Sequence, residues 1–414
     1  MSNQKKFEKA ANNEIEFLVM GLILLFSNVA LYFISGIMVR YFALLLGLLF
    51  IFFAAYKRGK HHIHKIIPFC SFSLTYFVIL GFISVFQNQV ISYDRVKQIF
   101  GIIIIGCFFS GYLLSTSKIY FIENFKSWKV RGLTVIIIFG LMGFLRYYEN
   151  ISFYGTMRGY GEDTALNPVG VAFTFTLLFM VYLVLTIFSQ NIFDKVLYGL
   201  GMSLSAAIVA TTASRGAIIW AIVTIIFLVT SSRIKKIKVS KFFILMLLGI
   251  IFSGFVFLFF SKSVILIESF ELLIDRFSGL FGSSNKTSSG LDISADSRIQ
   301  YWNHYASIFS DWIFFGERFY SGYPHNQYLE ILVRFGLLGI PLLVFSLFVI
   351  GQFINSFLLK KKQKDFELAL ISAIFLFAYL SSLSSLNLEM NRAMWLGLGY
   401  FFGYFTRRSR LIYN

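Results

Sequence analysis

The chain has 414 residues, of which 57% are hydrophobic and only 14% are charged. Soluble domains average about a quarter charged residues, so this much apolar surface requires a lipid bilayer as its solvent. The net charge of +17 does not indicate nucleic-acid binding, because the lysines and arginines stand in short clusters between apolar runs, as the flanking charges of membrane helices do.

Apolar runs of spanning length follow one another along the whole chain, and a spanning helix needs about 20 mainly apolar residues. We therefore predict an all-α, polytopic transmembrane helix bundle of about 12 spans, which forms a single integral membrane domain over residues 1–414. The stretch 196–232 is divided in two because Ser214, Arg215 and Gly216 interrupt it. The predicted spans are 17–36, 38–56, 66–86, 99–116, 131–148, 168–188, 196–213, 216–232, 242–261, 336–358, 366–386 and 392–405.

Positive residues set the predicted orientation, because they concentrate in cytoplasmic loops. With the N-terminus in the cytoplasm, most lysines and arginines fall in short inner segments along the whole chain, and both termini are predicted to be cytoplasmic. Two longer segments then face outward, an outer loop at 149–167 and a large extracytoplasmic loop at 262–335 between spans 9 and 10. Because loops on a rigid scaffold commonly carry function, we expect the functional site on the outer face.

The large outer loop is predicted to be partly helical. Its stretch 279–290 is rich in glycine, serine, asparagine and threonine, whereas the sequence from Ser297 onward is aromatic and patterned. Apolar residues recur there at helical spacing, at Ile299, Trp302, Ala306 and Phe309. This pattern predicts a short amphipathic helix that lies at the outer membrane interface or covers a cavity.

Three outward-facing residues are candidates for chemistry: Arg215 in the turn between two spans, Arg298 in the predicted helix, and His325. Asn326 suits the N-cap of the helix that enters span 10. The positive end of that helix would keep His325 neutral and able to accept a proton. Each residue also has an ordinary interpretation: an arginine reaching lipid headgroups, a solvated surface arginine, and a capping or interface histidine.

Other polar clusters point to no cofactor. His61, His62 and His64 lie on the predicted cytoplasmic side among positive residues, which favours contact with anionic lipid over a metal site. Cys70 and Cys107 each lie within an apolar run, where we expect them to be packing residues. The sequence contains no CxxC, HExxH, GxGxxG or Walker pattern, and we expect neither a metal nor another cofactor.

Three segments, in order and on the predicted outer face, resemble the O-antigen polymerase and O-antigen ligase superfamily of bacterial membrane glycosyltransferases. They are TTASRGAII (211–219), SRIQYW (297–302) and FFGERFYSGYPHNQYLEILVRFGLLG (314–339). Arg158 with Asn167 and Pro168 is a weaker match, and the resemblance covers about 150–345. The chain departs from the family after Gly316, where Glu317 and Arg318 replace a second glycine that the family often shows.

The resemblance implies an inverting, metal-independent transfer of a glycan from a polyprenyl diphosphate carrier, on the outer face of the bacterial cytoplasmic (inner) membrane. It implies that Arg215 and Arg298 neutralise the departing diphosphate, which suits the bidentate guanidinium group. His325 would be the general base for the acceptor hydroxyl. The residues expected to bind substrate are Arg158, Tyr301, Trp302, Tyr323, Asn326 and Glu330.

The leading hypothesis is a polymerase that joins lipid-linked oligosaccharide repeats into an O-antigen, capsule or exopolysaccharide. Its expected partners are the polyprenyl-diphosphate-linked oligosaccharide, the bilayer, a chain-length regulator and a flippase, with no nucleic acid among them. A ligase that passes the finished glycan to another acceptor would need the same arginines and base. A transporter would need ionisable residues or broken helices near mid-membrane, and a scaffolding membrane protein is the remaining alternative.

Overall fold

The computed structural model describes residues 2–59, 75, 101–115, 127–152, 168–212, 214–230, 293–316, 324–359, 366–384 and 391–413. Helices account for 92% of this described part, and no strand occurs in it. The all-α prediction is therefore confirmed for these residues. An all-helical fold is the expected outcome in lipid, where a helix satisfies every backbone polar group within one segment.

Six stretches of the described residues are long and apolar enough to cross a membrane. Where the structure describes the predicted spans, they fall mostly on helices; 242–261, all of 66–86 but residue 75, and the ends of several other spans lie outside the described residues. The chain is thus a membrane protein with several spans, and the count of about 12 stays a prediction. The six stretches are Asn13–Ile34, Met38–Lys57, Trp128–Tyr147, Val169–Phe188, Ile192–Thr211 and Gln327–Ser356.

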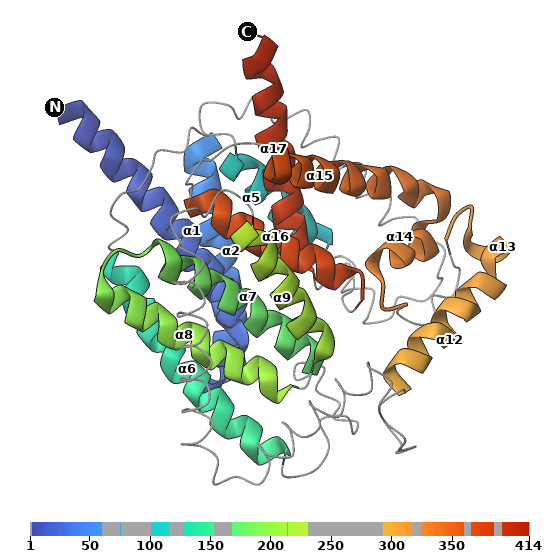
Figure 1. The fold of residues 1–414 in the computed structure, drawn as a ribbon, viewed down its shortest axis with the longest axis horizontal. Coiled ribbons are helices and arrows are strands. Elements are labelled where there is room, and N and C mark those ends of the chain that lie inside the picture. The colour runs from blue at the N-terminus through green and yellow to red at the C-terminus, as the bar shows by residue number, and fades with distance from the viewer. Residues whose placement is uncertain are drawn as a thin grey trace. The chain divides into compact units, whose positions relative to one another are not determined.

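The chain forms two compact units, of which unit 1 comprises Met1–Ala54, Ile119–Ser284 and Lys361–Phe377. Its helices are α1 (Ser2–Ser35), most of α2 (Ile37–Gly59), α6 (Trp128–Ser152), α7 (Pro168–Phe188), α8 (Ile192–Thr211), α9 (Arg215–Thr230) and the start of α16 (Phe366–Ser382). Helix α7 is apolar on all sides and packs along α8 and α1 (Figure 1). Phe175 of α7 lies 4.9 Å from Phe144 of α6, and Phe173 stacks on Phe377. Such a helix is expected at the centre of a bundle.

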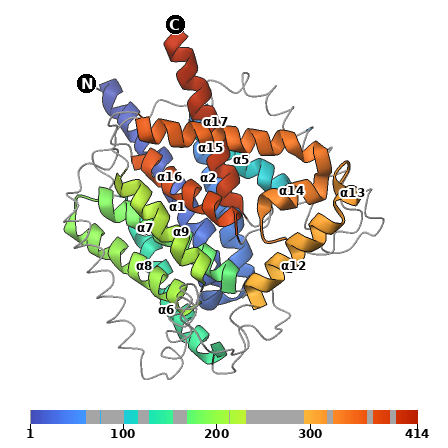
Figure 2. The same ribbon diagram turned by 45° about the vertical axis from the view of Figure 1, so that its right-hand side comes forward.

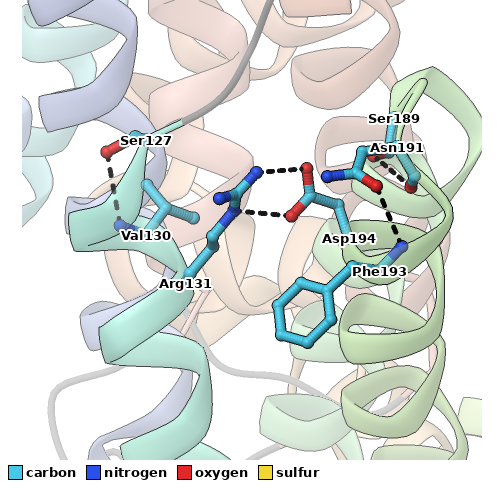
Figure 3. Close-up of polar contacts among 7 residues, drawn as sticks. All are labelled: Ser127, Val130, Arg131, Ser189, Asn191, Phe193 and Asp194. Carbon is cyan, nitrogen blue, oxygen red and sulfur yellow. Dashed lines mark hydrogen bonds and ion pairs between the residues drawn. The ribbon is translucent and has the colours of Figure 1, made fainter.

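The first turns of α6 and α8 are joined by an ion pair that the sequence analysis did not anticipate. Arg131 Nε lies 2.6 Å from Asp194 Oδ1, and Arg131 Nη2 donates to Asp194 Oδ2 at 2.8 Å (Figure 3). Asp194 is only 1% exposed. Asn191 caps the same end of α8, where its side chain accepts a hydrogen bond from the Phe193 N–H. The Asp194 carboxylate therefore has two favourable partners, a guanidinium fork and the positive end of a helix.

Glu16, near the start of the apolar stretch Asn13–Ile34 of α1, meets the start of α6 through further polar contacts. Ser127 donates to Glu16 Oε1, and Lys129 Nζ lies 3.4 Å from the same carboxylate oxygen. Together with the Arg131–Asp194 pair, these contacts bring Glu16 of α1 and the starts of α6 and α8 close to one another. The membrane orientation of the spans that start at 17, 131 and 196 stays a prediction.

Unit 2 comprises Ala55–Lys118, Asn285–Lys360 and Ala378–Asn414. Its helices are α5 (Gly101–Ser115), α12 (Ile293–Ser307), α13 (Phe309–Trp312), α14 (Gln327–Phe335), the 3₁₀ turn η4 (Gly336–Gly339), α15 (Ile340–Leu359) and α17 (Arg392–Tyr413). Helices α5 and α17 touch through backbone, because a Cβ at Gly111 or Gly399 would collide with carbonyls of the facing helix. Phe345 of α15 packs on both helices through Phe108 and Phe402. Cys107 of α5 is buried, as predicted for a packing residue.

We predict that Arg131→Leu lowers the free energy of unfolding by about 3 kcal/mol, because it leaves the buried Asp194 carboxylate without its counterpart. The double variant Arg131→Leu/Asp194→Leu should recover most of the loss, since no unpaired charge remains. The measurement is denaturant unfolding in detergent micelles. Lys129→Leu is the matched control and should cost less than about 1 kcal/mol, because Lys129 is 42% exposed. Equal losses from the single and double variants would contradict a coupled pair.

Candidate functional site

The His325 side chain stands on a short turn just before α14, and the backbone there is unusual. His325 has φ +56°, in the left-handed region that non-glycine residues seldom adopt and that often marks functional sites. Asn326 Oδ1 accepts hydrogen bonds from the N–H groups of Tyr328 and Leu329, at 3.0 and 3.1 Å. The predicted N-cap is thus confirmed. Asn326 Nδ2 also donates to the Leu383 carbonyl, which ties the turn to a second segment.

Helix α12 braces this turn from the side. Trp302 Nε1 donates to the Pro324 carbonyl at 2.7 Å, directly before His325. The ring centroids of Tyr301 and His325 lie 6.2 Å apart with the planes tilted by 57°. Figures 1 and 2 both show α12, α13 and α14 grouped together. The structure therefore brings together SRIQYW (297–302) and the part PHNQYLE (324–330) of the third segment on which the family resemblance rests.

Arg298 lies one turn before Tyr301 on α12 and acts electrostatically on the histidine. The pKa of His325 is lowered from its ordinary value of 6.5 to about 4, first by burial and then by the positive charge of Arg298. The imidazole is consequently neutral at physiological pH, as the sequence analysis expected. The physical cause differs from the expected helix dipole, since burial and a neighbouring guanidinium produce the shift.

The amphipathic helix predicted from Ser297 onward is present, but its packed face differs from the stripe that predicted it. Tyr305, Trp312 and Val333 form a buried cluster against which Tyr301 and Leu329 pack. Trp312 Nε1 donates to the Tyr305 carbonyl within this cluster. In contrast, Ile299, Trp302 and Phe309 of the predicted stripe are 51%, 42% and 52% exposed. Aromatic residues on both faces of this helix concealed which face packs against the protein.

Two glycines of the third resembling segment have a steric explanation. Gly316 has φ +87°, and a Cβ there would collide with the Arg334 carbonyl. Gly336 has φ +56°, and a Cβ there would lie 2.6 Å from the Phe314 carbonyl oxygen. Leu337 N–H donates to the Ile313 carbonyl at 2.7 Å beside them. The two glycines let the chain after α13 cross the C-terminal end of α14 at backbone contact distance.

Glu330 lies inside this unit rather than on its surface. Its carboxylate is fully buried and pairs with Arg334 Nη2 at 2.9 Å, one helical turn away. A role for Glu330 in substrate binding stays a prediction beside this structural pair. Sequence analysis missed Asn391, whose amide donates to Gln327 Oε1 at 3.0 Å. The available signal was an asparagine directly before the apolar run 392–405, the same N-cap pattern that identified Asn326.

Arg215 occupies the first position of α9, in the short turn after α8 ends at Thr211, so the predicted break between two helices is confirmed. Arg215 belongs to unit 1, and its convergence with the residues of unit 2 stays a prediction. Arg158 and Tyr323 lie outside the described residues, as do Cys70 and the cluster His61, His62 and His64.

Comparison with protein-family models, with curated proteins and with solved structures finds no match to this chain. Among the described residues, the candidate site consists of Arg298, Tyr301, Trp302, His325 and Asn326. The contacts given above hold these residues together in unit 2. The site offers a neutral imidazole within electrostatic reach of a guanidinium, with the Tyr301 ring near the imidazole. Such a set can accept a proton from a hydroxyl and hold an anion at the same place.

We predict that the His325 imidazole titrates near pH 4 in the folded protein, and that Arg298→Gln raises this pKa by removing the positive neighbour. The measurement is NMR of the histidine ring carbons in micelles, in a variant whose other four histidines are glutamine. Titration near pH 6.5 both with and without Arg298 would contradict the described environment.

We predict that Gly316→Ala lowers the free energy of unfolding by about 2 kcal/mol or more, because alanine is strained at positive φ and its methyl group meets backbone. The control is Gly351→Ala on α15, where a Cβ meets nothing within 4 Å. Alanine there should be neutral or raise stability by up to about 1 kcal/mol, the difference in helix propensity. Unfolding in detergent micelles compares the two, and equal effects would rule out the steric explanation.

Proposed function

We propose that this chain is a membrane glycosyltransferase that polymerises polyprenyl-diphosphate-linked oligosaccharide repeats into a surface polysaccharide. The observation that carries the proposal is the neutral His325 imidazole, fixed by the Trp302–Pro324 hydrogen bond next to Arg298. A base and a guanidinium at one place meet the two needs of the reaction. One is proton removal from the acceptor, and the other is charge neutralisation on the leaving diphosphate.

In the proposed step, a hydroxyl oxygen of the new lipid-linked repeat attacks the anomeric carbon of the growing chain. A carbon–oxygen bond forms there while the bond from that carbon to the diphosphate oxygen breaks. The hydroxyl proton passes to His325, and the diphosphate departs with the bonding electron pair. Attack from the side opposite the leaving group inverts the anomeric centre. Arg298 and Arg215 stabilise the charge that develops on the diphosphate, which is worth several kcal/mol in such sites.

The low pKa of His325 suggests that its strength as a base depends on whether the donor diphosphate is bound. A histidine of pKa about 4 is a weak base at neutral pH, and part of the lowering comes from the charge of Arg298. A diphosphate bound to Arg298 would offset that positive charge and raise the pKa of His325 toward neutrality. The base would then gain strength only when the donor is in place.

The aromatic residues and the outer loop fit a sugar substrate in this proposal. Tyr301 lies beside the imidazole and Trp302 beside the turn, where ring faces can stack on sugar rings. Tyr323 and Arg158 are proposed to extend the binding surface. Asn326, which caps α14, holds the adjoining turn in place beside that surface. The proposal places the site on the outer face of the bacterial cytoplasmic membrane.

A ligase that hands the finished glycan to a different acceptor is the alternative within this chemistry, because it would use the same base and arginines. The glycans that accumulate in cells lacking the gene distinguish a polymerase from a ligase. Loss of a polymerase leaves single repeats on the carrier or on the final acceptor, whereas loss of a ligase leaves long chains on the lipid. Loss of a transporter, the alternative from another class, leaves repeats on the inner face.

We predict that Arg215→Ala, Arg298→Ala and His325→Ala each leave single-repeat glycans at normal protein levels. Each change should lower the transfer rate by roughly 100-fold or more, the usual effect of losing a base or a charge-stabilising group. Arg215→Lys should also be defective, because an ammonium group lacks the bidentate fork. The measurement is surface glycan length by gel electrophoresis in a deletion strain that carries each variant.

The matched control is His304→Ala, since His304 is an exposed histidine on α12, the helix that also carries Arg298. It should restore the full glycan length distribution. Full-length glycan from all three site variants would reject the proposed function, even if deletion of the gene abolishes the polysaccharide.

A further inference from the structure

Two helix N-termini meet in unit 2, those of α14 and α17, and each has an asparagine cap. Asn326 caps α14, and Asn391 caps α17 by accepting a hydrogen bond from the Met394 N–H at 3.3 Å. The side-chain amide of Asn391 reaches across to the other helix, where Nδ2 donates to Gln327 Oε1 at 3.0 Å. Gln327 is the first residue of α14, so the starts of the two helices lie side by side.

The orientation of the Gln327 amide is fixed by its neighbour. Asn391 Nδ2 also donates to the Ala378 carbonyl at 3.0 Å, while Asn391 Oδ1 serves as the cap. Asn391 therefore presents an N–H donor to Gln327, so the Gln327 side chain must be oriented with its oxygen toward Asn391 to accept the hydrogen bond. The Nε2 group of Gln327, bonded to the same carbon, is left at the junction of the two N-termini.

The Nε2 group of Gln327 has no acceptor among the described residues, although the side chain is 0% exposed. A buried donor without a partner typically costs about 1–3 kcal/mol, and nearly all buried polar groups in folded proteins avoid this cost. An orphaned donor between two positive helix ends is the arrangement that an incoming anion would satisfy.

Arg392 is a second unusual group at the same junction. It follows Asn391 directly and is the first residue of α17, a helix with no acidic residue in its first turn. A cation at the positive end of a helix dipole is electrostatically unfavourable. The Arg392 Nε atom is buried, and the residue as a whole is partly exposed. An anion bound at this end of α17 would be stabilised by both the helix dipole and the guanidinium charge.

We propose that the junction of the α14 and α17 N-termini is an anion subsite that binds a phosphate group, with Gln327 Nε2 as hydrogen-bond donor and Arg392 as the neutralising cation. His325 lies two residues before Gln327, so the subsite adjoins the proposed catalytic turn. Identification of this phosphate as part of the carrier diphosphate rests on the proposed function. Arg392 and Gln327 would then hold the carrier independently of Arg215 and Arg298.

The test measures phosphate binding by the purified full chain, independently of glycan transfer. Thermal unfolding is followed in detergent micelles with increasing inorganic pyrophosphate. A second arm uses phosphatidylcholine nanodiscs with and without a polyprenyl diphosphate. The wild type should show a saturable rise of the unfolding midpoint with either probe. A rise with the lipid alone identifies a membrane-borne phosphate, and a rise with pyrophosphate alone identifies a soluble one; both support the subsite.

Two substitutions test the named groups. Arg392→Gln should weaken binding at least about 10-fold, as expected for loss of a charge-assisted hydrogen bond. Gln327→Glu keeps the oxygen that Asn391 needs and replaces the orphaned donor with a carboxylate oxygen, so repulsion should abolish binding. Arg407→Gln, near the opposite end of α17, is the control and should bind as the wild type does. If Gln327→Glu fails to fold, Arg392→Gln against Arg407→Gln decides alone.

Binding curves unchanged in both variants, or no midpoint rise in the wild type with either probe, would overturn the subsite. The glycan-length assay separates this failure from failure of the proposed function. Absence of binding with single-repeat glycans from His325→Ala would reject the subsite and leave the glycosyltransferase. Lost binding in Arg392→Gln with full-length glycans from His325→Ala, Arg215→Ala and Arg298→Ala would support the subsite and reject the glycosyltransferase.

Discussion

The hydrogen bond from Trp302 Nε1 to the Pro324 carbonyl is the contact on which the described site depends. It joins two segments that are 22 residues apart in the sequence and fixes the peptide just before His325. Together with the Tyr301 ring beside the imidazole, it holds the turn where Arg298 acts on His325. The strained φ of His325 is maintained from both sides, by this bond and by the Asn326 cap.

Polar contacts at helix ends occur in both units. They fix the register between neighbouring helices, which apolar packing alone does not specify. Lipid tails are as apolar as leucine, so burial alone gives helices in a membrane little reason to choose one register over another. In unit 1, Arg131 and Asp194 align the starts of α6 and α8, and Glu16 brings α1 close to the start of α6. In unit 2, Asn391 aligns the starts of α14 and α17. These contacts leave the helix centres to apolar and glycine-mediated packing.

The sequence alone predicted the helices well, because lipid imposes one simple rule: an apolar run must satisfy its own backbone as a helix. Local chemistry was also readable, as the break at Arg215 and the cap at Asn326 show. Contacts between residues far apart in the sequence could not be predicted. Asp194 meets Arg131 across 63 residues and Asn391 meets Gln327 across 64, and neither pairing has a local pattern. The packed face of α12 was missed because aromatic residues lie on both of its faces.

The proposed function requires Arg215, Arg298 and His325 to act on one departing diphosphate. The most direct measurement is an experimental structure of the full chain in a lipid nanodisc with a bound polyprenyl diphosphate. The account predicts both guanidinium groups in bidentate contact with the phosphates, and the imidazole facing the carbon end of the scissile bond. A diphosphate bound away from all three residues, or Arg215 on the membrane face opposite His325, would contradict the account.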